Sequence, residues 1–164
     1  MMNPENFRIL FLAHYAPDSV TSPIPSGIKD VSYAQYHLRV FQVLKKLFPQ
    51  TRSSRSPEIM LQKNVDVDYI FSLYNRMPFR NSEVFVSAVA EYHKIPYLGA
   101  SPNIRALAED KHLAKMMARY AGVDTPAWQV YNIGGPLQPP DFNPPYFCKP
   151  RFGAASIGIT ESSA

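Results

Sequence analysis

The chain has 164 residues, of which 46% are hydrophobic and 13% aromatic, and its formal net charge is +4. This length suits one domain, or a small domain with part of another, and the apolar content excludes a disordered chain. The basic residues are scattered and we find no nucleic-acid-binding motif, so the charge predicts no nucleic-acid partner. Only Arg52 and Arg55, in TRSSRS, form a small basic cluster, which we interpret as a solvated loop.

The single cysteine, Cys148, excludes an internal disulfide and is typical of a reducing cytoplasm. It follows Phe147 in an apolar run that we expect to form a strand, so we predict a buried thiol. No run approaches the roughly 20 apolar residues of a membrane span, and the N-terminus does not have the pattern of a signal peptide. We therefore expect a cytoplasmic protein without a membrane partner.

The first predicted element is a strand over residues 7–13, FRILFLA, whose continuous apolar run is typical of a parallel sheet buried on both faces. From Asp30 to Phe48, apolar residues recur every three or four positions, which predicts an amphipathic helix. We expect Asp30 to cap this helix and Pro49 to end it. A weak strand candidate at 59–61 and a stronger one at 68–73 follow.

The second half of the chain continues with a predicted helix over residues 82–94 and a short strand over 95–98. Strands that alternate with helices predict a parallel sheet with right-handed crossovers. Ser101 and Asp110 are predicted to cap two further helices, and Gly122 to stop the second one. A strand is expected after Pro126, and strands at 146–149 and 156–160 predict a β-hairpin.

Three features that suit phosphate binding occur in order along the chain. They are Lys111 at a predicted helix start, Lys149 near the end of a predicted strand, and the small-residue loop RFGAASIG. Phosphate binding needs fixed cations and backbone N–H groups that a turn leaves available. Taken singly, a helix lysine is more often a solvated surface group, and a turn of small residues is more often only a turn. The hypothesis of a phosphate site therefore depends on the three features occurring together.

Three segments resemble the ATP-grasp ligases, most closely the D-alanine–D-alanine ligases, in their residues and in their order along the chain. They are IPYLGASPN, EDKHLAKMMARYAGVDTPAW and PPYFCKPRFGAASIGI. Residues 95–160 carry this resemblance, and the N-terminal part matches in layout. It implies an α/β fold in which an open parallel-sheet, Rossmann-like pre-ATP-grasp substrate domain (1–101) comes first. A helical connector (102–126) and an incomplete, truncated ATP-grasp α+β subdomain (127–164) would follow.

The resemblance also implies ATP and Mg²⁺ as cofactors. Lys111 and Lys149 would bind the phosphates, and the loop with Gly153, Ala155 and Ser156 would cover the terminal phosphate. The implied reaction activates a carboxylate as an acyl phosphate, which an amine then attacks. In the family, the adenine hinge, the metal-binding acids and the catalytic arginine lie beyond the predicted hairpin. We therefore expect no catalytic residue and no metal ligand within this chain, and no activity of the chain alone.

The chain departs from the family pattern at three places. Ala154 and Ala155 replace the family's Gly-Ser, which removes one hydroxyl donor. The segment after the first strand has no glutamate, and Asp18 is the only acid near the place where the family binds the first substrate's amine. The segment LYNRMPFRNSE replaces the family's His-Gly-containing loop. Arg76 or Arg80 in this segment could bind the carboxylate of a small amino-acid-like substrate, although a solvated loop arginine is the simpler interpretation.

The leading hypothesis is the N-terminal part of an ATP-dependent carboxylate–amine ligase, and two alternatives stay open. One is a non-catalytic binding or assembly module that keeps the same fold and self-associates as a homodimer through exposed edges and apolar surface. The other is a doubly wound small-molecule-binding domain of a different family. The absence of a G-x-G-x-x-G motif after residues 7–13 argues against a dinucleotide fold.

Overall fold

The computed structural model describes residues 3–22, 24, 31–74, 84–153, 156 and 158–164. The chain divides into two compact units, Met1–Pro78 with Ser82–Pro102 (unit 1) and Phe79–Asn81 with Asn103–Ala164 (unit 2). The predictions that concern Asp30, Arg76, Arg80, Ala154 and Ala155 fall outside the described residues.

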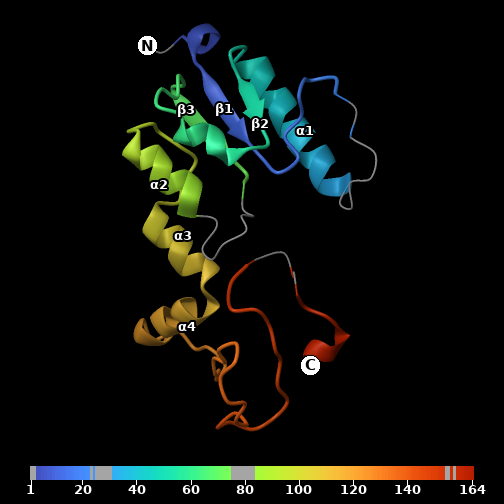
Figure 1. Cartoon of the computed structure of the whole chain (residues 1–164), viewed down its shortest axis with the longest axis vertical. Coiled ribbons are helices and arrows are strands. Elements are labelled where there is room, and N and C mark those ends of the chain that lie inside the picture. The colour runs from blue at the N-terminus through green and yellow to red at the C-terminus, as the bar shows by residue number, and fades with distance from the viewer. Residues whose placement is uncertain (1–2, 23, 25–30, 75–83, 154–155, 157) are drawn as a thin grey trace. The chain divides into compact units, whose positions relative to one another are not determined.

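Unit 1 contains a three-stranded sheet in which all strands are parallel (Figure 1). The central strand β1 (Ile9–Leu12) lies between β2 (Arg52–Ser54) and β3 (Tyr69–Ser72), with Leu10 opposite Ile70. The predicted parallel sheet is thereby confirmed. The predicted strand at 95–98 is reduced to one parallel bridge, between Tyr97 and Ile70.

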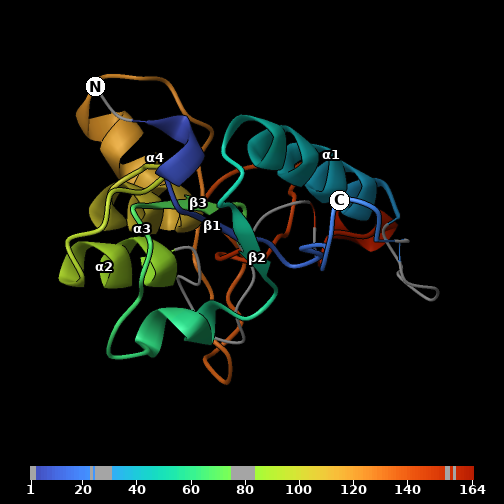
Figure 2. The ribbon, with the colours of Figure 1, turned by 90° about the horizontal axis from the view of Figure 1, so that it is seen from above.

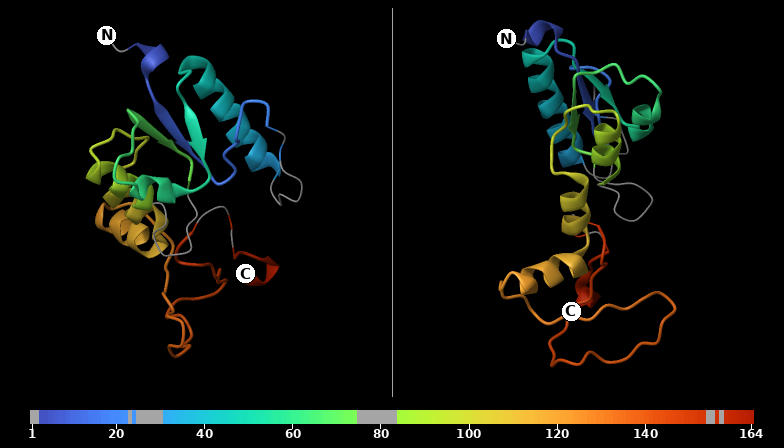
Figure 3. Two further views of the ribbon diagram at one scale, coloured as in Figure 1. Left: turned by 45° about the horizontal axis from the view of Figure 1, so that its top comes forward. Right: turned by 90° about the vertical axis from the view of Figure 1, so that its left-hand side faces the viewer.

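Helices cover both faces of this sheet (Figures 2 and 3). On one face, Phe11 of β1 packs with Phe41 and Leu44 of α1 (Val31–Leu47). On the other, Leu10 packs with residues of α2 (Val84–Tyr92) and of the 3-10 helix η2 (Pro57–Leu61). All four β1 residues are buried, because a central strand with both faces covered has no solvent side. This confirms the interpretation of the first apolar run.

Unit 2 begins with two short helices, α3 (Pro102–Glu109) and α4 (Lys111–Tyr120). Asp110 separates them and caps α4, since its carboxylate accepts hydrogen bonds from the N–H groups of His112 (3.0 Å) and Leu113 (3.3 Å). Gly122, at φ +73°, follows the end of α4, so both the predicted start and the predicted stop are confirmed. None of the helices in the described part of the chain is long and apolar enough to cross a membrane.

The predicted β-hairpin near the C-terminus is wrong. In the described part of residues 121–164 the chain forms no strand, and its only regular element is the 3-10 helix η3 (Glu161–Ser163). The N–H of Cys148 donates instead to the carbonyl of Ser163 (2.6 Å), and Cys148 is exposed rather than buried. Strands form only where a neighbouring strand accepts their backbone bonds, and an apolar pattern does not reveal whether that neighbour exists.

Two assignments within unit 1 are also corrected. The polar segment predicted as a loop supplies β2, because its backbone pairs with β1 although its side chains are polar. The weak strand candidate at 59–61 belongs to η2, which Pro57 begins. Another 3-10 helix, η1 (Pro4–Asn6), precedes β1.

Candidate functional site

The start of α4 is bonded to the turn that follows Lys149. The backbone N–H of Lys111 donates to the carbonyl of Arg151 (3.1 Å). Its ammonium group donates to the carbonyls of Gly153 (2.7 Å) and Arg151 (3.5 Å). The structure thus brings together Lys111 and Gly153, two of the residues predicted to bind a nucleotide. An ammonium group has three N–H donors, so it can bind a phosphate oxygen beside these carbonyls or in exchange for them.

A bidentate ion pair connects the same two segments. The Arg151 guanidinium donates from Nε to Oδ1 of Asp110 (2.8 Å) and from Nη2 to Oδ2 (2.6 Å). The Asp110 side chain is only 4% exposed. The hydrogen bond from Arg151 is the main reason why the pKa of Asp110 falls to about 2. The sequence pattern indicates Asp110 only as a helix cap and gives no sign of Arg151, since a separation of 41 residues leaves no local signal.

The positive charge of Lys149 acts on two lysines of α4. Burial, and after it the positive charge of Lys149, lowers the pKa of Lys111 below its usual value. The same two causes, in the same order, lower the pKa of Lys115. Cations that disfavour one another's charged form are stabilised by a bound anion. The region around Lys111 therefore suits an anionic ligand.

The loop after Arg151 has three described residues in the left-handed region, where φ is positive. They are Gly153 (φ +93°), Ser156 (φ +56°) and Gly158 (φ +77°). A Cβ atom on Gly158 would lie 2.8 Å from Cγ of Pro150, so glycine is required there for space as well as for conformation. Turns of this kind direct successive backbone N–H groups toward a common point, which suits phosphate oxygens. A non-glycine residue at positive φ, such as Ser156, is also typical of functional loops.

The tryptophan of the chain is packed beside the same helix. The indole N–H of Trp128 donates to Nδ1 of His112 (2.8 Å). The ammonium group of Lys115 and the guanidinium carbon of Arg119 lie 5.2 Å and 5.3 Å from the ring centre, which is cation–π distance. Because the sequence has a single tryptophan, its fluorescence reports on unit 2.

The carboxyl ends of the strands in unit 1 are lined with aromatic and histidine side chains. The rings of His14 and Tyr74 are 5.7 Å apart, and Nδ1 of the buried His37 accepts the N–H of Tyr15 (3.3 Å). Ligands of open parallel sheets bind at this end. Asp18, the acid considered for binding a substrate amine, forms an ion pair with Arg55 (2.9 Å).

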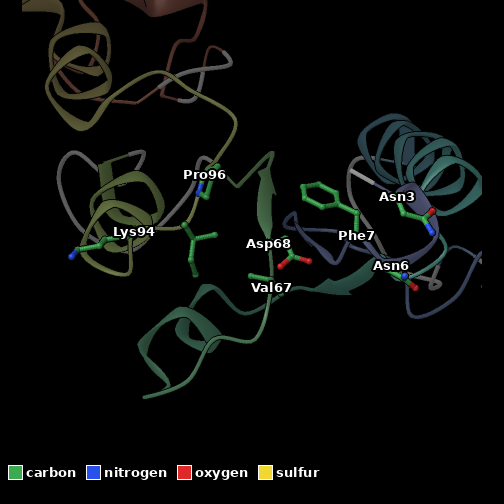
Figure 4. A pocket seen from close by; sticks show the side chains of 8 residues that line it. Asn3, Asn6, Phe7, Val67, Asp68, Lys94 and Pro96 are labelled. Atoms are coloured by element: carbon green, nitrogen blue, oxygen red, sulfur yellow. The ribbon is translucent and has the colours of Figure 1, made fainter. Parts of the chain in front are cut away.

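A pocket lies at the opposite, amino ends of β1 and β3 (Figure 4). Phe7, Asp68 and Pro96 are among its lining residues. Asp68 already forms an ion pair with Arg8, with Nη2 and Oδ1 2.7 Å apart. We assign no ligand to this pocket.

Acidification should release the Asp110–Arg151 pair. A folded-state pKa of about 2, below the ordinary 3.8, means that the fold favours the carboxylate. This stabilisation is present above about pH 4 and is lost as the pH falls toward the folded-state pKa. We expect Trp128 fluorescence to change between about pH 4 and pH 2 in the unaltered chain and in Asp68→Asn, but not in Asp110→Asn. An identical change in Asp110→Asn would assign the transition to other groups.

Curated proteins with similar sequences include several D-alanine–D-alanine ligases. One from Synechococcus sp. is 34% identical over 79 residues, which are 46% of this chain and 24% of the ligase. One from Frankia casuarinae is 32% identical over 102 residues, 60% of this chain and 26% of the ligase. One from Helicobacter acinonychis is 22% identical over 148 residues, 80% of this chain and 42% of the ligase.

The chain is homologous to the D-alanine–D-alanine ligases. These similarities support the resemblance to the N-terminal part of the ligases. The solved structure of the Bacillus anthracis D-alanine–D-alanine ligase, complexed with ATP, matches 81% of this chain and 41% of that one. The TM-score is 0.53 at 18% identity, which supports the shared α/β fold. No protein-family profile matches the chain.

The chain matches only a part of each ligase, about a quarter of the Synechococcus protein. Because the match is partial, the similarity to the D-alanine–D-alanine ligases establishes only a common ancestry and a shared fold. It confirms the resemblance found in the sequence. Of the five residues predicted to bind the nucleotide, Lys111, Lys149, Gly153 and Ser156 lie in described parts of unit 2. Ala155 and the candidate substrate ligand Arg76 lie outside the described residues.

Proposed function

We propose that the chain supplies the first substrate domain and part of the ATP site of a carboxylate–amine ligase that resembles D-alanine–D-alanine ligase. The observation that carries this proposal is the bonding of Lys111, at the start of α4, to the turn that follows Lys149. In a homologue of an ATP-dependent ligase, a lysine held beside the turn that follows a second lysine suits the phosphate chain of ATP. Residues 1–101, 102–126 and 127–164 would be the substrate domain, the helical connector and the beginning of the ATP-grasp subdomain.

The chemistry proposed for the whole ligase is transfer of the terminal phosphoryl group of ATP to a carboxylate, which an amine then attacks. Positively charged side chains promote such transfers by stabilising negative charge on the phosphoryl oxygens. We assign this role to Lys111 and Lys149. The backbone of Gly153, Ala155 and Ser156 would bind phosphate oxygens, and Arg76 would bind a substrate carboxylate.

In such a ligase, Mg²⁺ would accompany ATP and neutralise charge on its phosphates. Among the residues described here, no three His, Cys, Asp or Glu side chains gather in a group that could hold a metal. We therefore assign no side chain of this chain to Mg²⁺ and route no step through it.

Calorimetric titration with ATP, together with a phosphate-release assay with ATP, Mg²⁺ and D-alanine, tests the proposal. We expect saturable ATP binding but no steady phosphate release, because the chain matches only a part of the catalytic ligases. Absence of ATP binding would contradict the proposed site. Steady, D-alanine-dependent release would show that the chain alone is active.

A second candidate is a non-catalytic module that assembles as a homodimer. It is favoured by the large apolar side chains that α4 leaves exposed, such as Met116, Met117 and Tyr120, the last 89% exposed. Exposed apolar groups of this kind favour association. Light scattering on the samples used for titration separates the two candidates, since a stable dimer without ATP affinity would favour the module.

A further inference from the structure

The ion pair between Asp110 and Arg151 joins the two places where the phosphate-binding lysines are expected. Asp110 directly precedes Lys111, and Arg151 is two residues after Lys149. The same two segments are also joined by the backbone bond from Lys111 to Arg151 and by the ammonium bond to Gly153. The separation between the two lysines therefore depends on contacts that the ion pair supports.

We propose that Asp110 and Arg151 are positioning residues, which hold the turn after Lys149 against the start of α4 so that Lys111 and Lys149 bind one polyphosphate chain. This inference rests on the proposed ATP site and assigns two residues to it that the family resemblance did not supply. Arg151 acts here through the two lysines.

The contacts of Arg151 explain why we assign it to positioning and not to ligand binding. Two of its nitrogens, Nε and Nη2, donate to the carboxylate of Asp110. Its guanidinium carbon lies 5.1 Å from the ring centre of Phe152, so one face of the group is also covered. A guanidinium committed in this way has its orientation set by the protein before a ligand arrives.

The distribution of charge agrees with this role. Asp110 places a negative charge beside Lys111, but this charge affects the pKa of Lys111 less than the positive charge of Lys149 does. The carboxylate directs both of its oxygens to Arg151. The ion pair thus fixes the geometry of the site and leaves a positive potential for an anion.

Titration with inorganic tripolyphosphate tests the proposal, because this probe needs the phosphate site and no adenine contacts. The decisive variant is Asp110→Asn, since asparagine still caps a helix but cannot form the ion pair. Removal of a negative charge should by itself strengthen anion binding, whereas loss of positioning should weaken it. We expect binding about tenfold weaker in Asp110→Asn and in Arg151→Lys, which corresponds to about 1.4 kcal/mol.

The double variant should bind no more weakly than either single variant, because both remove the same interaction. Arg119→Ala is the matched control: it removes an arginine of unit 2 that contacts Trp128 and should leave tripolyphosphate binding unchanged. Trp128 fluorescence and thermal unfolding of each variant report whether unit 2 is folded. Weakened binding in variants whose unit 2 remains folded supports positioning.

Unchanged or tighter binding in Asp110→Asn would overturn the inference. If Lys149→Ala still weakens binding in that case, the proposed ATP site stands and only the positioning role fails. If the unaltered chain binds neither tripolyphosphate nor ATP, the proposed function fails, and the inference fails with it. Weakened binding that accompanies unfolding of unit 2 in both Asp110→Asn and Arg151→Lys would show that the pair has a structural role only.

Discussion

Replacement of Lys149 by alanine should weaken ATP binding by this chain about 10- to 100-fold. Hydrogen bonds to charged groups contribute about 1.5–3 kcal/mol, and each 1.4 kcal/mol changes a dissociation constant tenfold. Lys149 is exposed, so its replacement removes charge without disturbing a packed core. The change also relieves the repulsion on Lys111 and should raise the pKa of that ammonium group. Calorimetric titration with ATP measures the effect.

Lys111→Ala should have a similar effect on ATP affinity, with an additional loss of order in the loop, because Lys111 also donates to Gly153. The matched control is Lys46→Ala, an exposed lysine of α1 in unit 1, which makes the same change in net charge. If Lys46→Ala weakened binding as much as Lys149→Ala, binding would depend on the overall charge of the chain and not on a local site. Higher salt concentration should then reduce binding equally in all variants.

Phe11→Ala should destabilise unit 1 by about 3–5 kcal/mol, the usual cost of truncating a fully buried aromatic side chain. Phe11 is 0% exposed at the centre of the sheet. Its ring centre lies 5.9 Å from that of Phe41 on α1 and 6.1 Å from that of Phe71 on β3. The cavity would remove packing contacts between the sheet and α1, the helix that covers this face. Urea unfolding followed by circular dichroism measures the loss, and hydrogen exchange of the β1 amides assigns it to unit 1.

Leu47→Ala is the control for this change, since Leu47 lies on α1 but is 56% exposed. Surface substitutions of this kind usually alter the free energy of unfolding by less than about 0.5 kcal/mol. Equal destabilisation by the two variants would mean that the sheet face against α1 is not the core of unit 1. Trp128 fluorescence should be insensitive to Phe11→Ala if the two units unfold separately.

Much of the fold could be predicted because its signals are local. The buried β1, the helices α1 and α2 and the two ends of α4 follow from hydrophobic periodicity, cap residues and glycine, which act over a few neighbouring positions. The strand β2 could not be found in this way, because polar side chains hide a strand that is defined by its backbone bonds to β1. The predicted hairpin failed for the opposite reason, since an apolar pattern cannot supply a partner strand.

In the candidate site, too, local features could be predicted and contacts between distant segments could not. The sequence by itself determined that Lys111 begins a helix that Asp110 caps, and that Lys149 precedes a turn rich in small residues. Only the tertiary structure decided that Arg151 reaches back across 41 positions to the carboxylate of Asp110, and that Lys111 bonds the carbonyl of Gly153. Helix caps and turns are set by near neighbours, whereas a bidentate ion pair needs two distant segments to be brought into contact, and that contact is created by the folded chain.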